Sequence, residues 1–329
     1  MNTLLTVPTG NIGIIEASKG KLEFVSLKDY GKHKNIKADF LGYTEEINQV
    51  PHGDLMPYTK KWVITISTQY GCSMKCKFCD VPSVGKGINA SSKDMLDQIM
   101  TALSLNQEIV YTDRLNIHYA RMGEPTFNND ILELTPLLKE KVKERIDAKT
   151  VHPVISTMLP KNNKKLLHFL KEWCNIKNNF YKGEAGLQFS INSTDDAQRN
   201  DMFQGCSLSL EDISELGKLL PAPVGRKYAL NFALADGFIV DAKRLKSLFD
   251  PNKFMVKITP IHQNTACNKN NIITSNGYFD YSPYRGVERS LIKEGFDVLV
   301  FIPSIEEDTS RITCGNAILS DEIKYMVKD

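Results

Sequence analysis

The sequence predicts an α/β fold: a partial (β/α)6 barrel of the TIM type with a small N-terminal β-rich appendage and a C-terminal extension. From residue 61 onward, β-type runs alternate with amphipathic helical runs, which is typical of βα units around a parallel sheet. The 329 residues exceed one ordinary domain, yet α/β barrels often extend past roughly 200 residues as one unit. We therefore expect an accessory segment over 1–60, the barrel over 61–303 and a C-terminal segment over 304–329.

The expected elements follow in order along the chain. Residues 1–60 contain short apolar stretches broken by Gly and Lys, without a helical period, which indicates short strands or irregular structure. Strands are then expected at 62–67, 115–120, 151–157, 186–191, 227–233 and 254–260, with a further one at 297–302. Apolar residues at helical spacing predict helices at 92–105, 129–146, 164–174, 210–220 and 241–249, the first capped by Ser91 or Ser92.

Composition and charge exclude several classes of protein. No apolar run approaches the 18 or so residues of a membrane span, and the N-terminus has no secretory pattern, so we expect a soluble cytoplasmic protein without a membrane partner. The formal net charge of +2 gives only weak support for a large polyanionic partner. Seven cysteines, three of them within eight positions, suit a metal site in a reducing compartment better than a disulfide framework.

Cys72, Cys76 and Cys79 have C-x3-C-x2-C spacing on the loop that follows the first barrel strand. Functional groups of parallel βα folds gather where strands end and loops begin. Three thiolates at this spacing can each bind one iron of a [4Fe-4S] cubane, which leaves the fourth iron open to a small chelating molecule. S-adenosylmethionine (SAM) can chelate that iron, and one electron can then break its sulfonium bond to give a 5′-deoxyadenosyl radical.

A structural zinc ion and plain buried cysteines are the alternative interpretations of this motif. Zinc usually has four protein ligands, and no nearby Cys or His supplies the fourth, although a remote residue could. The three-cysteine spacing therefore favours the cluster.

At this motif the sequence resembles the radical SAM superfamily, and residues 67–72 (STQYGC) are similar to the RlmN/Cfr family of 23S ribosomal RNA adenine methyltransferases. Further similarities occur in order over roughly residues 52–319, at 122–125 (MGEP), 155–157, 189–192, Arg199, 236–237, 257–260 and 314–315. The resemblance implies the radical SAM form of the barrel. It also implies a reducing electron donor such as flavodoxin or ferredoxin, and RNA or a nucleotide as substrate.

The resemblance assigns SAM contacts to residues at strand ends. Glu124 would offer a carboxylate to the ammonium group of SAM, and Gly123 would let the backbone approach the ligand. Ser156, Ser190 and Asn192 would bond the carboxylate or ribose of SAM. His262 stands where the family has a SAM-binding asparagine, and neutral imidazole can also donate or accept a hydrogen bond. Taken singly, each of these residues also fits ordinary turn or cap chemistry.

Cys314 corresponds to the family's C-terminal cysteine, which one SAM methylates before the radical from a second SAM removes hydrogen from the S-methyl group. The resulting radical adds to C2 or C8 of adenine. The chain also departs from the family: Thr65 replaces a second mechanistic cysteine, and His52 replaces a proton-accepting glutamate. A threonine hydroxyl cannot close a disulfide. Cys206 or Cys267 could substitute for that cysteine, although buried or idle thiols are the simpler explanation of both.

Three functions remain open from the sequence. The first is a radical SAM enzyme that methylates an unreactive nucleobase carbon through Cys314, with His52 as proton acceptor. The second is a radical SAM enzyme that takes hydrogen directly from a non-ribosomal substrate, with Cys314 as hydrogen donor or radical carrier. The third is a non-catalytic metal-binding redox sensor. The last does not explain Gly123, Glu124 or the strand-end serines.

Overall fold

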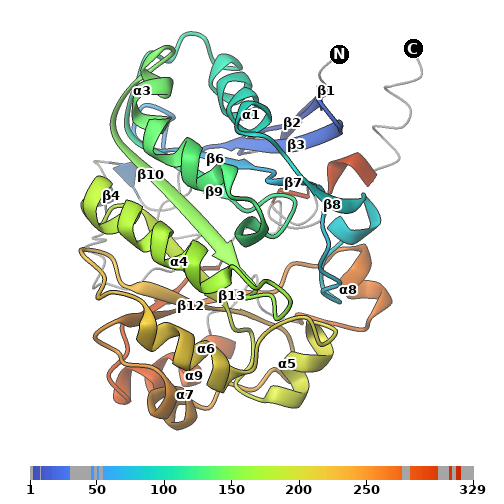
Figure 1. Ribbon diagram of the computed structural model, residues 1–329, viewed down its shortest axis with the longest axis vertical. Helices are drawn as coiled ribbons and strands as arrows, with labels where there is room; N and C mark the ends of the chain where they lie inside the picture. Colours follow the sequence, from blue (N-terminus) through green and yellow to red (C-terminus); the bar gives the residue numbers. More distant parts are fainter. Residues whose placement is uncertain are drawn as a thin grey trace.

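The computed structural model describes residues 3–7, 9–29, 46–47, 50–51, 55–275, 282–302, 311–312 and 316–319. A ten-stranded sheet in the order β1-β2-β3-β6-β9-β10-β11-β12-β13-β14 forms its centre (Figure 1). From β6 onward the strands are parallel and adjacent in chain order, which is the arrangement of a partial barrel built from βα units. The α/β class predicted from the sequence is confirmed.

Each strand predicted for the barrel is present. They are β6 (Trp62–Ile66), β9 (Tyr111–Tyr119), β10 (Asp147–Thr157), β11 (Gly186–Ser190), β12 (Tyr228–Leu234), β13 (Phe254–Pro260) and β14 (Val298–Val300). The strand expected at 297–302 pairs in parallel with β13, so the described wall has one more parallel strand than the six of the predicted barrel.

The N-terminal strands continue the same sheet. β1 (Thr3–Val7), β2 (Gly10–Ala17) and β3 (Gly20–Leu27) form an antiparallel meander, and β3 pairs antiparallel with β6. The register places Val25 opposite Thr65. The β-rich appendage is therefore hydrogen-bonded directly to the first barrel strand. Two short hairpins accompany it, β4 (Glu46–Ile47) with β5 (Val50–Pro51) and β7 (Gln69–Gly71) with β8 (Lys86–Asn89).

Helices cover the outer side of the strands (Figure 1). They are α1 (Ser92–Ser104), α2 (Asp130–Leu134), α3 (Leu138–Lys143), α4 (Leu166–Asn175), α5 (Asp196–Met202), α6 (Leu210–Leu219), α7 (Ala242–Leu248), α8 (Thr265–Lys269) and α9 (Ser282–Lys293). The single helix expected over 129–146 is wrong in detail. A 3-10 turn, Thr135–Leu137, separates α2 from α3, because Pro136 has no N–H for the α-helical hydrogen bond. No helix among the described residues is long and apolar enough to cross a membrane.

Alternation along the strands separates an apolar face from a polar one. In β6, for example, Trp62, Ile64 and Ile66 are fully buried, whereas Val63 and Thr65 are partly exposed. The apolar residues join the helices in one core, because successive strand side chains point to opposite faces. The opposite, inner face carries partly exposed polar side chains: Thr65, His118, Ser156, Gln188, Ser190, Asn231, Lys257 and Thr259.

Candidate functional site

The three motif cysteines lie on a loop fixed by the β7–β8 hairpin, directly after the first barrel strand. The Cys72 amide donates to the Gly85 carbonyl at 3.1 Å. Gly71 has a φ of +76°, and a Cβ there would lie 2.2 Å from the Gly85 oxygen. A side chain at residue 71 is therefore excluded, and the close approach of the two hairpin strands sets where Cys72 begins the loop.

The thiols share a water-poor environment. Cys72 and Cys76 pack with Phe78 against Met74 and Phe203. Burial raises the pKa of Cys72 to about 12, that of Cys79 to about 11, and that of Cys76 well above its usual value. The charges of Cys72 and Cys79 also raise the pKa of Cys76. Such a set stays protonated unless metal cations compensate for the thiolate charges.

The donor set fits an iron-sulfur cluster. Within the described residues, no three His, Cys, Asp or Glu side chains converge as closely as a single metal ion requires. A cubane does not need that convergence, because each thiolate binds its own iron. The Met74 amide donates to the Cys72 sulfur at 3.4 Å, and the Gly123 amide also hydrogen-bonds it, which favours the ionised ligand.

Glu124 lies next to these thiols, at the carboxyl end of β9. Its charge acts on Cys72 and Cys76. The carboxylate is 3% exposed and accepts hydrogen bonds from Thr126 Oγ1 at 2.7 Å, the Thr126 amide at 3.1 Å and the Met158 amide at 3.0 Å. Burial nevertheless raises its pKa, so the ionised form lacks compensation. A positively charged ligand group beside Glu124 would provide it.

Gly123 is required by the packing of the loop. Its φ is +102°, and a Cβ would lie 2.6 Å from the Gln69 Cβ. Gln69 Oε1 in turn accepts from the Glu124 amide at 2.9 Å, and the Thr68 amide donates to the Met122 carbonyl at 2.8 Å. These contacts join the cysteine hairpin to the Gly-Glu-Pro turn, so the two motifs hold one another in place.

The predicted residues Ser156, Ser190 and Asn192 lie on or directly after two neighbouring strands, β10 and β11. Ser156 on β10 pairs in register with Gln188 on β11, and Ser190 at the end of β11 pairs with Asn231 on β12. Asn192, in the left-handed region with φ of +61°, is buried, and its Oδ1 accepts from the Ala233 amide at 3.0 Å. The structure thus brings the two serines to the polar inner face. Asn192 uses its side-chain oxygen within the protein.

Arg199 fixes this corner of the site. Its side chain is buried, and its guanidinium donates to the Ile191 carbonyl and, at 3.3 Å, to the Ser190 carbonyl. The other arm donates to Ser207 Oγ at 2.9 Å. The match at Arg199 therefore has a structural use, because the residue holds the turn after β11 against the loop after α5.

Cys206 and Cys267, the two candidates for a second working thiol, have different environments. Cys267 is fully buried, and its thiol donates to the His262 carbonyl at 3.2 Å. His262 is itself buried, after the end of β13. Cys206 is partly exposed, packs against Phe203 and Met158, and its charge acts on Cys76. Both thiols adjoin the cysteine loop, because the Cys267 thiol also donates to the Phe78 carbonyl at 3.6 Å, but of the two only Cys206 is partly exposed.

His52 and Cys314 lie outside the described residues, so their roles stay predictions. Residues 311–312 and 316–319, which flank residues 313–315, are described. Ile312 and Ala317 pack against Ile12, Ile14 and Val25 of the N-terminal strands.

Several inner-face residues were missed by the sequence reasoning. His118 on β9 lies opposite Thr65 in register, and burial together with the charges of Lys257 and Arg226 lowers its pKa to about 3, so its imidazole is neutral. Asn231 Oδ1 is buried and has no hydrogen-bond partner within the described part of the chain. The available signal was a polar residue at alternate positions of an otherwise apolar strand.

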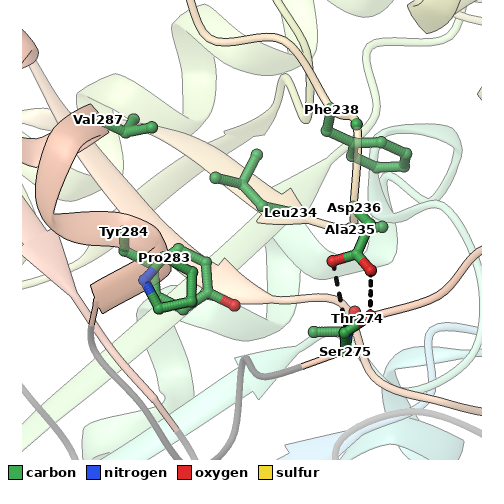
Figure 2. A pocket seen from close by; sticks show the side chains of 10 residues that line it. Leu234, Ala235, Asp236, Phe238, Thr274, Ser275, Pro283, Tyr284 and Val287 are labelled. Carbon is green, nitrogen blue, oxygen red and sulfur yellow. Dashed lines mark hydrogen bonds between the residues drawn. The ribbon is translucent and has the colours of Figure 1, made fainter.

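A separate cavity of about 460 Å³ opens at the carboxyl end of β12, against α9 (Figure 2). Asp236 and Gly237, one of the motif matches, form part of its wall, and the Asp236 carboxylate accepts hydrogen bonds from Ser275. Figure 2 shows Tyr284 and Pro283 of α9 on the other side. No residue of the cysteine loop lines this cavity. The Asp-Gly match therefore shapes a neighbouring hollow and not the thiol set.

No family model matches the chain. The chain is 25% identical over 215 residues to the probable dual-specificity RNA methyltransferase RlmN of Petrotoga mobilis, a match that spans 64% of this chain and 57% of that protein. It is 23% identical over 286 residues to the dual-specificity RNA methyltransferase RlmN of Campylobacter lari, across 84% of this chain and 76% of that protein. The chain therefore spans little more than half the length of the Petrotoga relative.

A solved structure shares the fold. The crystal structure of a radical SAM methyltransferase from Sphaerobacter thermophilus superimposes with a TM-score of 0.60 and 16% sequence identity, over 91% of this chain and 76% of that chain. The three-cysteine loop stands at the end of the first parallel strand, where the sequence resemblance places it. The chain is thus similar in sequence to RlmN methyltransferases and shares its fold with a radical SAM methyltransferase.

Proposed function

We propose that this chain is a radical SAM enzyme that methylates an unreactive carbon of a nucleobase, adenine-like, in RNA or a related substrate. One observation carries the proposal: the three partly buried motif cysteines lie on a loop that is hydrogen-bonded to the turn of the buried Glu124, at the carboxyl ends of parallel strands. The printed names of the relatives, RNA methyltransferases, support RNA as the substrate class.

Each described residue has a defined part in this proposal. Cys72, Cys76 and Cys79 would hold three irons of a [4Fe-4S] cluster. Glu124 would accept a charge-assisted hydrogen bond from the ammonium group of SAM, which would oppose the effect of burial on its pKa. Ser156 and Ser190 would bond the carboxylate or ribose of SAM. SAM bound to the cluster would supply the 5′-deoxyadenosyl radical once a donor such as flavodoxin or ferredoxin had reduced the cluster.

The later steps belong to residues near the ends of the chain. Cys314 would carry the methyl group as a thioether, and His52 would accept a proton near neutral pH. Asn192 and His262 would complete the SAM contacts predicted from the sequence. Intact-mass analysis after anaerobic incubation with SAM tests the carrier: a methyl group located on Cys314 supports the proposal, and an unmodified Cys314 contradicts it.

Thr65 changes how the product can leave. It lies on β6, opposite His118, and its hydroxyl cannot form a disulfide. Cys206, beside Cys76 and partly exposed, is better placed than the buried Cys267 to supply a second thiol.

Alanine replacement of Cys72, Cys76 or Cys79 should abolish release of 5′-deoxyadenosine, because two thiolates cannot hold the cubane with one open iron. The measurement is chromatographic quantification after anaerobic reconstitution with iron, sulfide, SAM and dithionite. Cys174→Ser is the matched control, because Cys174 is a fully buried thiol on α4 that packs in the core. Release that persists in the Cys76→Ala protein would falsify the ligand assignment.

A further inference from the structure

A buried ion pair lies where three parts of the chain meet: the N-terminal strands, the carboxyl end of β9 and the C-terminal segment. The Arg121 and Glu23 side chains are 3% and 0% exposed. Arg121 Nε donates to Glu23 Oε1 at 2.6 Å, and Nη2 donates to the same oxygen. Arg121 lies two residues after the end of β9 and immediately before the Met-Gly-Glu-Pro turn. A pair buried this completely costs desolvation, so its use is better explained by geometry than by stability.

The other donors of Arg121 and the second carboxylate oxygen of Glu23 form hydrogen bonds with the C-terminal segment. Arg121 Nη1 donates to the Ile312 carbonyl at 2.6 Å, and Nη2 donates to the Arg311 carbonyl at 2.7 Å. The second oxygen of Glu23 accepts from the Ile318 amide at 3.0 Å. One ion pair therefore binds the chain on both sides of residues 313–315.

Further contacts close the same segment. Arg311 Nη1 donates to the Asn316 carbonyl at 3.3 Å, which links one flank directly to the other. Ile312 and Ala317, together with Ile318, pack on the apolar side of the N-terminal meander. Three residues, Cys314 among them, separate Ile312 from Asn316 in the sequence.

The ion pair lies beside the turn that supports the cysteine loop. Arg121 directly precedes Met122, whose carbonyl accepts from the Thr68 amide at 2.8 Å and from the Gln69 amide at 3.1 Å, at the start of the β7–β8 hairpin. The anchor for the C-terminal segment therefore adjoins the Met-Gly-Glu-Pro turn.

We propose that Arg121 and Glu23 are positioning residues that hold the segment carrying Cys314 against the cluster end of the barrel. The inference rests on the proposed function, in which Cys314 carries the methyl group. Reactions between positioned groups are sensitive to displacements of about 1 Å, which can cost about a hundredfold in rate. Anchoring both flanks with one guanidinium and one carboxylate limits such displacement.

The test compares Arg121→Met, Arg121→Lys and Glu23→Gln with the wild-type holoenzyme. Lys227→Met is the matched control, because Lys227 pairs with Asp297 at 2.5 Å near the amino ends of β12 and β14, at the opposite end of the barrel. Three quantities are measured anaerobically: 5′-deoxyadenosine release, the rate of S-methylation of Cys314, and the rate of Cys314 alkylation by iodoacetamide. Cys206 alkylation in the same digest is the internal reference.

We expect Arg121→Met and Glu23→Gln to keep 5′-deoxyadenosine release while Cys314 methylation falls about tenfold to a hundredfold, with faster Cys314 alkylation. A protein that had simply lost its fold would lose both activities, so the split between them identifies positioning. Arg121→Lys keeps the charge but lacks the second donor arm, and should lie between wild type and Arg121→Met. The Lys227→Met protein should match wild type.

Unchanged Cys314 alkylation and methylation in Arg121→Met and Glu23→Gln would overturn the inference. If Arg121→Met does not fold, Glu23→Gln and Arg121→Lys decide with the same readouts. If Cys314 in the wild type is never methylated, the proposed function fails, and the alkylation rates alone still decide whether the pair anchors this segment.

Discussion

The buried Glu124 carboxylate is oriented by hydrogen bonds within the protein and can still bind a cationic ligand group. Its oxygens accept from Thr126 and Met158, which orient it at the end of β9. Burial raises its pKa in spite of these bonds, and its charge acts on Cys72 and Cys76. Such a group gains most from a cationic partner, and the ammonium group of SAM is the cation that the proposed cofactor would bring.

Glu124→Gln should therefore weaken SAM binding while the loop keeps its shape. The amide oxygen can still accept from Thr126, but the charge-assisted bond is lost, and hydrogen bonds to charged groups are worth about 1.5–3 kcal/mol. We expect the KM for SAM in 5′-deoxyadenosine release to rise about tenfold to a hundredfold. A KM equal to that of the wild type would show that Glu124 does not contact the ligand.

Cys206 tests whether the fourth iron is free of protein ligands. Its charge contributes to the raised pKa of Cys76, and its side chain is partly exposed. If it were a fourth ligand, its removal would change both cluster content and SAM cleavage. We expect Cys206→Ser to retain wild-type iron and sulfide content and wild-type 5′-deoxyadenosine release. Loss of either would mean that the site is a four-cysteine cluster.

At the scale of elements, the start of α1 joins the N-terminal meander to the barrel. The Ser91 hydroxyl accepts from the Asp94 amide at 3.1 Å, and the Asp94 carboxylate accepts from the Ser91 amide at 3.0 Å, which is a capping box. The same carboxylate accepts from Ser18 Oγ at 2.8 Å, in the turn between β2 and β3. Burial acts to raise the pKa of Asp94, but these hydrogen bonds prevail and lower it to about 2.

Asp94→Asn should lower the free energy of unfolding by about 1–2 kcal/mol at pH 7. Because the folded-state pKa lies below the ordinary value of 3.8, the stabilisation is complete above about pH 4 and is lost as the pH falls toward 2. The difference between variant and wild type should therefore shrink over that range in urea denaturation of the metal-free protein. Asp97→Asn, an exposed residue of the same helix paired with Lys93, should change stability little.

The periodicity of apolar residues predicted most helices and strands. It failed at a proline within a helical pattern and at the polar inner face of the strands. The first barrel strand could be located because the apolar residues Trp62, Ile64 and Ile66 recur at every second position. In the structure these residues are buried and the residues between them are partly exposed. The expected helix over 129–146 was wrong because Pro136 interrupts a pattern whose apolar spacing continues through it. The polar inner face was not recognised, since His118 or Asn231 singly is an unremarkable polar residue until the register brings such residues together.

At the scale of the whole molecule, contacts between residues close in the sequence could be predicted, whereas contacts between distant residues could not. The motif cysteines and Glu124 were identified because short spacings carry their chemistry. The pairing of β3 with β6 and the Glu23–Arg121 ion pair were not predicted. The first joins Val25 to Thr65, the second joins residues 98 positions apart, and no local pattern encodes either contact. The roles of His52 and Cys314, and the division at residues 60 and 303, remain predictions.

The central claim is that one iron of a three-cysteine cluster is open to SAM, which makes the barrel a source of 5′-deoxyadenosyl radical. Anaerobic reconstitution of the full chain with iron and sulfide, followed by SAM and dithionite, tests this directly. We predict time-dependent formation of 5′-deoxyadenosine and methionine in equal amounts, dependent on all three motif cysteines. A reconstituted protein that binds zinc alone, or a reduced cluster that leaves SAM intact, would contradict the account.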